Sequence, residues 1–250
     1  MNKKLIIRFA SLVFVLAFIT VTLGFTHAEW KALAVNDIQV KYADDYRFVS
    51  EKEIKDIVSR NFKALYHASL DAVDIQQIED KIEENAWVKK AEVYKGYALG
   101  DSVRAGGAIV IKIIQETPVL RVVDETGGFY LNAFGKKLPV SLHHTQKVMV
   151  VSGSCPDSVL TKTILPFVNH INGDKFWQSL FMQVHVKQGG ELVLVPRVGN
   201  HQIEFGYPEN IEQKLRNLKL VYTKGFAKTD FDKYKTVNLK YNNQVVCTLK

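Results

Sequence analysis

The sequence predicts an α+β protein with an N-terminal transmembrane helix, then a β-α-α-β-β domain, then a mostly antiparallel β-domain with flanking helices. Three patterns predict this class. An apolar run lies near the N-terminus, two helical periodicities follow one alternating strand pattern, and short strand patterns separated by glycine turns recur through the second half. The expected divisions are a cytoplasmic tail over 1–8, the transmembrane helix over 9–27, the first domain over 35–116 and the second over 117–250.

The apolar run from Phe9 to Phe25 follows three basic residues, Lys3, Lys4 and Arg8. A helix of about 20 apolar residues spans a bilayer, and this run approaches that length. Positive charge before the run predicts a cytoplasmic N-terminus and an inner-membrane, single-pass chain with periplasmic C-terminal domains. A cleaved signal peptide is the alternative, because Thr26 and Ala28 place small residues at the two positions that a signal peptidase inspects; the length of the run favours the anchor.

Charge and cysteine content exclude several classes of protein. Lys and Arg total 33 and Asp and Glu 26, and the two signs alternate along the chain, which is typical of a solvated surface and predicts no nucleic-acid partner. Cys155 and Cys247 lie too far apart for a metal or redox motif. Solitary buried thiols are the favoured interpretation, and a disulfide between them stays open.

The first domain is expected to hold three strands and two helices. Ser50 and Glu53 form a capping box that begins one helix, and Asp74 begins a second helix over 74–85. Both helices are expected to cover one face of the sheet. Its strands are expected over 38–42, 87–94 and 109–114, the last two as a hairpin around a glycine-rich loop.

The second domain is expected to be richer in strands. Pro166 predicts a kink or break in a helix over 157–171, and a further helix covers 210–222. Two extended runs, Thr236–Tyr241 and Gln244–Leu249, flank Asn242-Asn243, which predicts a two-residue hairpin turn. The other strands are expected at 119–123, 147–151, 183–186, 192–195 and 202–205, and a strand followed by a turn is expected within 129–137.

Sequence patterns for catalysis and cofactor binding are missing. Gly106-Gly107 lacks the Gly-Lys-Ser/Thr end of a phosphate-binding loop, and the run from Ser152 to Cys155 is no nucleophile elbow. His143-His144 has no third ligand at metal spacing. We therefore predict no enzymatic activity, no cofactor, no metal and no small-molecule substrate.

Several segments together resemble the bacterial cell-division family FtsQ, also called DivIB, in its Bacteroidetes-type form. The segments are AWVKKAEV at 86–93, QETPVLR at 115–121, FW at 176–177, ELVLVPRVG at 191–199, KLRNL at 214–218 and QVVC at 244–247. The resemblance covers essentially the whole chain and implies that residues 35–116 form a POTRA domain. Two departures stand out: Asn132 replaces a frequent Asp, and the loop from Gly96 to Gly107 is long.

The resemblance implies a divisome scaffold of the inner membrane, located at the division septum. Such a protein binds other division proteins, of the FtsB and FtsL type, through its periplasmic domains during septum formation. A POTRA-bearing periplasmic adaptor of another envelope assembly is the alternative.

The candidate partner-binding residues lie at the end of the chain. A terminal strand paired on one side leaves N–H and C=O groups to which an extended partner segment can add. The resemblance implies that the last strands receive a segment of FtsB, with Lys240, Tyr241 and Leu249 at contact positions. Alternatively, Val245, Cys247 and Leu249 bury against the helix over 210–222. The full candidate set is Lys240, Tyr241, Gln244, Val245, Val246, Cys247, Thr248 and Leu249.

Overall fold

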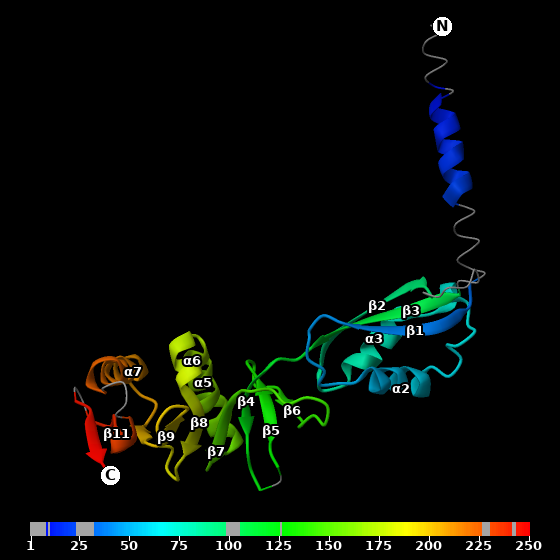
Figure 1. Ribbon diagram of the computed structural model, residues 1–250. Helices are drawn as coiled ribbons and strands as arrows, with labels where there is room; N and C mark the ends of the chain where they lie inside the picture. Colours follow the sequence, from blue (N-terminus) through cyan, green and yellow to red (C-terminus); the bar gives the residue numbers. More distant parts are fainter. Residues whose placement is uncertain are drawn as a thin grey trace. The chain divides into compact units, whose positions relative to one another are not determined.

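The chain divides into two compact units, Met1–Gln115 and Glu116–Lys250. The computed structural model describes residue 9 and residues 11–23, 33–98, 106–125, 127–226, 231–241 and 244–250 (Figure 1). The expected tail over 1–8, parts of the expected membrane span and of the Gly96–Gly107 loop, and Asn242-Asn243 lie outside these residues.

Unit 1 has the expected β-α-α-β-β order. In its described residues, the three-stranded sheet has the order β1-β3-β2, with β1 parallel and β2 antiparallel to β3. Both helices lie on the same side of the sheet (Figure 1). The elements are β1 (Val35–Tyr42), α2 (Glu51–Asn61), a 3-10 turn (Leu70–Ala72), α3 (Ile75–Glu83), β2 (Val88–Tyr97) and β3 (Gly107–Gln115).

The helix starts in unit 1 follow the predicted caps. The Glu53 N–H donates to Ser50 Oγ at 3.2 Å, and the Ser50 N–H donates to the Glu53 carboxylate at 2.8 Å. Asp74 accepts from the N–H groups of Gln76 and Gln77. These bonds satisfy N–H groups that have no partner inside the helix, so both predictions are confirmed.

A buried glutamine fixes the segment that leads into α2. Gln115, at the end of β3, is 2% exposed, and its Oε1 accepts from the N–H groups of Phe48 at 2.8 Å and Val49 at 3.3 Å. Its Nε2 donates to the Tyr46 carbonyl at 2.7 Å. The Gln115 side chain thus provides hydrogen-bond partners for two backbone N–H groups and one carbonyl group.

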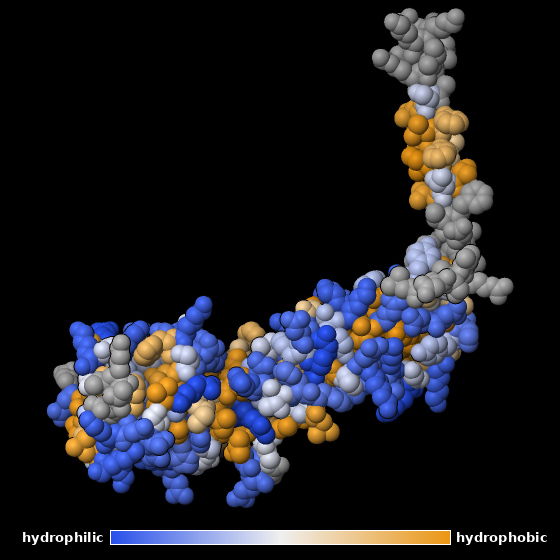
Figure 2. All heavy atoms as spheres, in the orientation of Figure 1, coloured by the Kyte–Doolittle hydropathy of each residue, from blue (hydrophilic) through white to orange (hydrophobic). Residues whose placement is uncertain are grey.

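Residues 11–23 are helical and expose apolar side chains (Figure 2). Phe14 and Phe18 are among the exposed side chains. Among the helices that the structure describes, none combines the length and the apolar character needed to cross a membrane.

The described residues of unit 2 form a nine-stranded sheet with the order β12-β11-β10-β9-β8-β7-β4-β5-β6. Its core contains Phe167, Phe181 and Phe205. The strands are β4 (Pro118–Val122), β5 (Phe129–Asn132), β6 (Lys137–Leu138), β7 (Met149–Gly153), β8 (Phe181–Val186), β9 (Leu192–Pro196), β10 (Gln202–Gly206), β11 (Tyr234–Asn238) and β12 (Val246–Leu249).

Most of the described strand pairs in this sheet are antiparallel, as expected. Three pairs run parallel: β4 with β7, β7 with β8, and β10 with β11. A parallel pair needs a crossover connection, and the helices supply the last two. The helices lie on one side of the sheet in Figure 1. They are α4 (Asp157–Val159), α5 (Leu165–Asn172), α6 (Lys175–Leu180) and α7 (Ile211–Leu220).

The predicted effect of Pro166 is confirmed. A π-helical segment, Leu160–Ile164, stands immediately before α5 and joins it to α4. Proline has no N–H and its ring crowds the preceding turn, and the wider π turn relieves both conflicts. A second π segment, Val221–Gly225, extends α7.

Replacing Gln115 tests how unit 1 is held together. We expect Gln115→Leu to lower the free energy of unfolding of unit 1 by about 2–4 kcal/mol, because each unpaired buried polar group costs roughly 1–3 kcal/mol. Gln76→Leu, at an exposed position of α3, is the control, with an expected change within about 0.5 kcal/mol. Urea unfolding measures both, and equal transitions for the two variants would contradict the role given to Gln115.

Candidate functional site

The last strand lies at the edge of the sheet in unit 2. β12 is antiparallel to β11, with Val237 opposite Cys247 and Asn238 opposite Val246. Within the described residues, no strand pairs with the other side of β12. This unpaired side is called the β12 edge below.

Backbone groups of β12 point to its unpaired side. The Lys250 N–H donates to the Lys233 carbonyl at 3.0 Å and therefore faces β11. Because N–H groups of successive residues in an extended strand point to opposite sides, those of Leu249 and Cys247 face the β12 edge. A partner strand could accept hydrogen bonds there.

The side chains of this segment divide between the core and the surface. Val245 and Cys247 are half-buried and pack against the hydrophobic core, as the alternative interpretation expected. Val246, Thr248 and Leu249 are exposed, and Leu249 is 62% exposed. The burial expected for Leu249 is therefore wrong, because its side chain lies at the surface.

The predicted two-residue hairpin turn is also wrong. β11 ends at Asn238 and β12 begins at Val246, so Lys240, Tyr241, Gln244 and Val245 lie in a longer connection. Asn238 Oδ1 accepts from the Lys240 N–H at 2.9 Å, a local bond that ends the strand.

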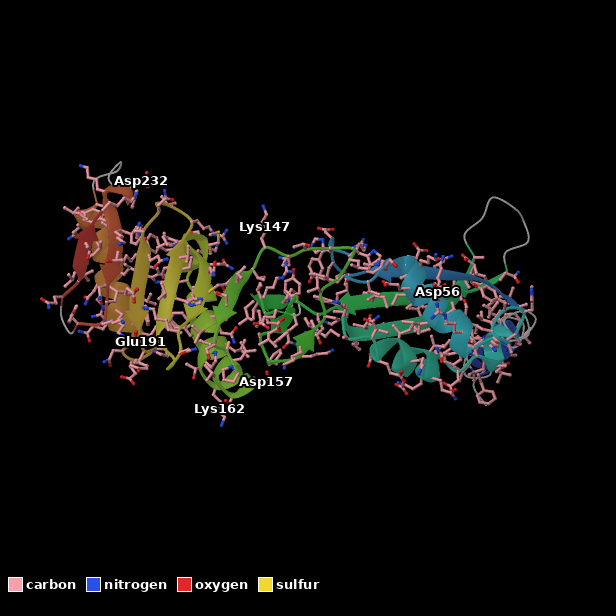
Figure 3. All side chains as sticks on the ribbon, turned by 90° about the horizontal axis from the view of Figure 1, so that it is seen from below. Asp56, Lys147, Asp157, Lys162, Glu191 and Asp232 are labelled. Carbon is pink, nitrogen blue, oxygen red and sulfur yellow. The ribbon has the colours of Figure 1, made fainter. Side chains whose placement is uncertain are left out.

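Lys240 anchors the connection to neighbouring strands. Its Nζ lies 2.5 Å from Glu191 Oε2 and 3.6 Å from Glu204 Oε2, while Lys187 contacts the same Glu204 carboxylate at 2.8 Å. The hydrogen bond with Glu191 raises the pKa of Lys240 and lowers that of Glu191. Figure 3 shows Glu191 at one end of these strands, with Asp232 at the other.

An apolar groove of about 400 Å³ adjoins the connection. Leu220, Val221 and Gly225 of the α7 region line it, together with Gln244 and Val245 of the last segment. Tyr241 is 52% exposed and lies beside a smaller pocket at the same helix. Sequence reasoning missed this groove, which needs α7 and the last segment to meet.

A partly buried aromatic cluster lies at the opposite end of β11. His201 Nε2 lies 2.6 Å from the Tyr222 hydroxyl. Phe226 and Phe231 pack against this pair, and Tyr234 packs against Phe226. Burial lowers the pKa of His201 and raises that of Tyr222. Both groups are therefore neutral near pH 7. Neither His201 nor Tyr222 was predicted from the sequence to form this contact.

The thiols of Cys155 and Cys247 are unreactive. Cys155 and Cys247 are free and half-buried. Burial raises the pKa of Cys155 to about 11 and also raises that of Cys247, so both stay protonated at neutral pH. In the part of the chain that the structure describes, no cluster of three His, Cys, Asp or Glu residues could hold a metal ion.

Comparisons with known proteins identify both units. A family model described as a POTRA-like domain matches residues 35–99. No curated protein matches the chain. A family model described as FtsQ/DivIB, C-terminal related, matches residues 117–248, more than half of the chain. In the sequence, the POTRA-like domain precedes an FtsQ/DivIB-type second unit. This chain therefore belongs to the FtsQ/DivIB-related family.

Proposed function

We propose that the chain is a non-enzymatic, inner-membrane scaffold of the division machinery, which binds a division protein of the FtsB or FtsL type at the β12 edge. The observation that carries the proposal is the position of β12, which pairs with β11 at the end of the sheet in unit 2. Membership of the FtsQ/DivIB-related family supports a role in division.

The membrane part of the proposal rests on the N-terminal segment. Residues 11–23 form a helix whose apolar side chains are exposed, and the apolar sequence continues to Phe25. A helix that is apolar all round needs an apolar environment. Basic residues before it favour a cytoplasmic N-terminus and periplasmic units.

Backbone pairing at the β12 edge needs help from side chains. A hydrogen bond contributes about 0.5–1.5 kcal/mol net to binding. Association costs roughly 4–15 kcal/mol, because the partners lose translational and rotational freedom. β12 has four residues, so its few bonds set register and direction without holding a partner alone. Binding energy must therefore come from apolar contacts nearby.

The connection and the groove supply those contacts. Tyr241 and Leu249 are exposed on either side of Val245, and Val245 itself lines the groove beside α7. Exposed aromatic side chains next to a pocket are frequent centres of binding energy. Lys240 is bound to Glu191, so we assign it the role of holding the connection in place.

Replacing Leu249 separates backbone pairing from side-chain contact. We expect Leu249→Pro to weaken co-purification with an FtsB-type partner by roughly tenfold or more, because proline removes an outward N–H and adds bulk at the β12 edge. Leu249→Ala keeps the N–H and should lose less. Retained binding by the proline variant would exclude strand addition at β12.

Replacing Tyr241 tests the aromatic anchor. We expect Tyr241→Ala to weaken partner binding by about 1–2 kcal/mol, which is about fivefold to thirtyfold, and Tyr241→Phe to retain most of it. Tyr66→Ala, at an exposed tyrosine of unit 1, is the matched control and should leave the dissociation constant unchanged. Equal affinities of Tyr241→Ala and the unsubstituted chain for the partner would show that Tyr241 does not contribute to binding.

The position in the cell distinguishes a division scaffold from an adaptor of another envelope assembly. A fluorescent fusion to the N-terminus should form a band at mid-cell in dividing cells. A fusion that carries residues 1–34 alone is the control and should label the membrane uniformly. Uniform labelling by the full chain would argue against the division role.

A further inference from the structure

Unit 1 has an edge strand of its own, and this strand is longer than β12. β2 has ten residues and lies at the end of the sheet order β1-β3-β2. A long edge strand offers a row of backbone groups to any extended chain, including a second copy of the same protein. Soluble domains therefore block such edges.

Two carboxylates from α3 occupy the outer side of β2. The Val93 N–H donates to Glu79 Oε1 at 2.7 Å, and the Ala91 N–H donates to Glu83 Oε1 at 2.9 Å. These are the positions at which an added strand would place its carbonyl groups. Hydrogen bonds to an ionised acceptor are also stronger than those to a carbonyl.

The spacing of the carboxylates matches that of the strand. Four residues along a helix advance about 6.0 Å, and two residues along a strand advance about 6.6–6.8 Å. Glu79 faces Val93 and Glu83 faces Ala91, so α3 runs antiparallel to β2 at this contact. Successive outward N–H groups thus meet successive turns of the helix.

The position of α3 is itself fixed. Ile78 and Ile82 are buried in the core of unit 1, and Asp74 caps the first turn of the helix. An incoming strand would have to displace both carboxylates and would bring its carbonyl oxygens close to their negative charges. Both effects oppose pairing.

We infer that Glu79 and Glu83 close the β2 edge, and that without these carboxylates a second copy of this chain would pair with it. The inference concerns unit 1 and goes beyond the proposed function. It holds or fails whether or not a partner binds β12.

Two double variants of the full chain test the inference. Glu79→Ala with Glu83→Ala removes both acceptors, whereas Glu79→Gln with Glu83→Gln keeps an acceptor oxygen at each position and removes the charge. Amide hydrogen exchange at Ala91 and Val93 and sedimentation velocity are measured over a range of concentrations. Circular dichroism checks that both variants stay folded.

In the alanine variant, we expect exchange at both amides to rise at least tenfold at low concentration. At high concentration, a dimer should form and protection should return. The glutamine variant should remain monomeric with slow exchange. An alanine variant that stays monomeric at all concentrations would overturn the inference, as would an unsubstituted chain that already dimerises through β2.

If the double alanine variant fails to fold, the single variants are measured instead. Glu79→Ala should speed exchange at Val93 alone, and Glu83→Ala should speed exchange at Ala91 alone. Unchanged exchange at these amides would overturn the inference.

Discussion

The backbone N–H and C=O groups on both sides of a strand need hydrogen-bond partners. The described part of the chain gives β12 a partner strand on one side. The function proposed for the protein depends on this constraint. Water can satisfy the remaining N–H and C=O groups, but a partner strand satisfies them while burying the apolar side chains beside them. The exposed position of Leu249 and the groove at α7 put such side chains next to the β12 edge.

The other sheet edges differ from β12 in how they are covered. Carboxylates of α3 bind the outer N–H groups of β2, and β6 has two residues. The start of β1 is bonded to a neighbouring segment, where the Val35 N–H donates to the Ala68 carbonyl at 2.9 Å. β12 combines an unpaired side with an adjoining apolar groove, and this combination favours it as the docking site.

Local patterns could be predicted from the sequence, whereas contacts between distant residues could not. Ser50, Asp74 and Pro166 act on their own helices, and each has the predicted effect. The prediction of a two-residue turn was wrong because Lys240 bonds to Glu191, 49 positions earlier, and because Asn238 ends β11. The roles of Gln115 and Glu79 also depend on partners that are remote in sequence, so neither was predicted.

Amide hydrogen exchange on the complex measures the central claim most directly. The full chain is compared alone and with a bound FtsB-type division protein, and the amides of Cys247 and Leu249 are followed. Strand addition predicts that both become strongly protected, while Val237 in β11, which is already paired, changes little. Binding that leaves Cys247 and Leu249 exchanging at their original rates would contradict docking at the β12 edge.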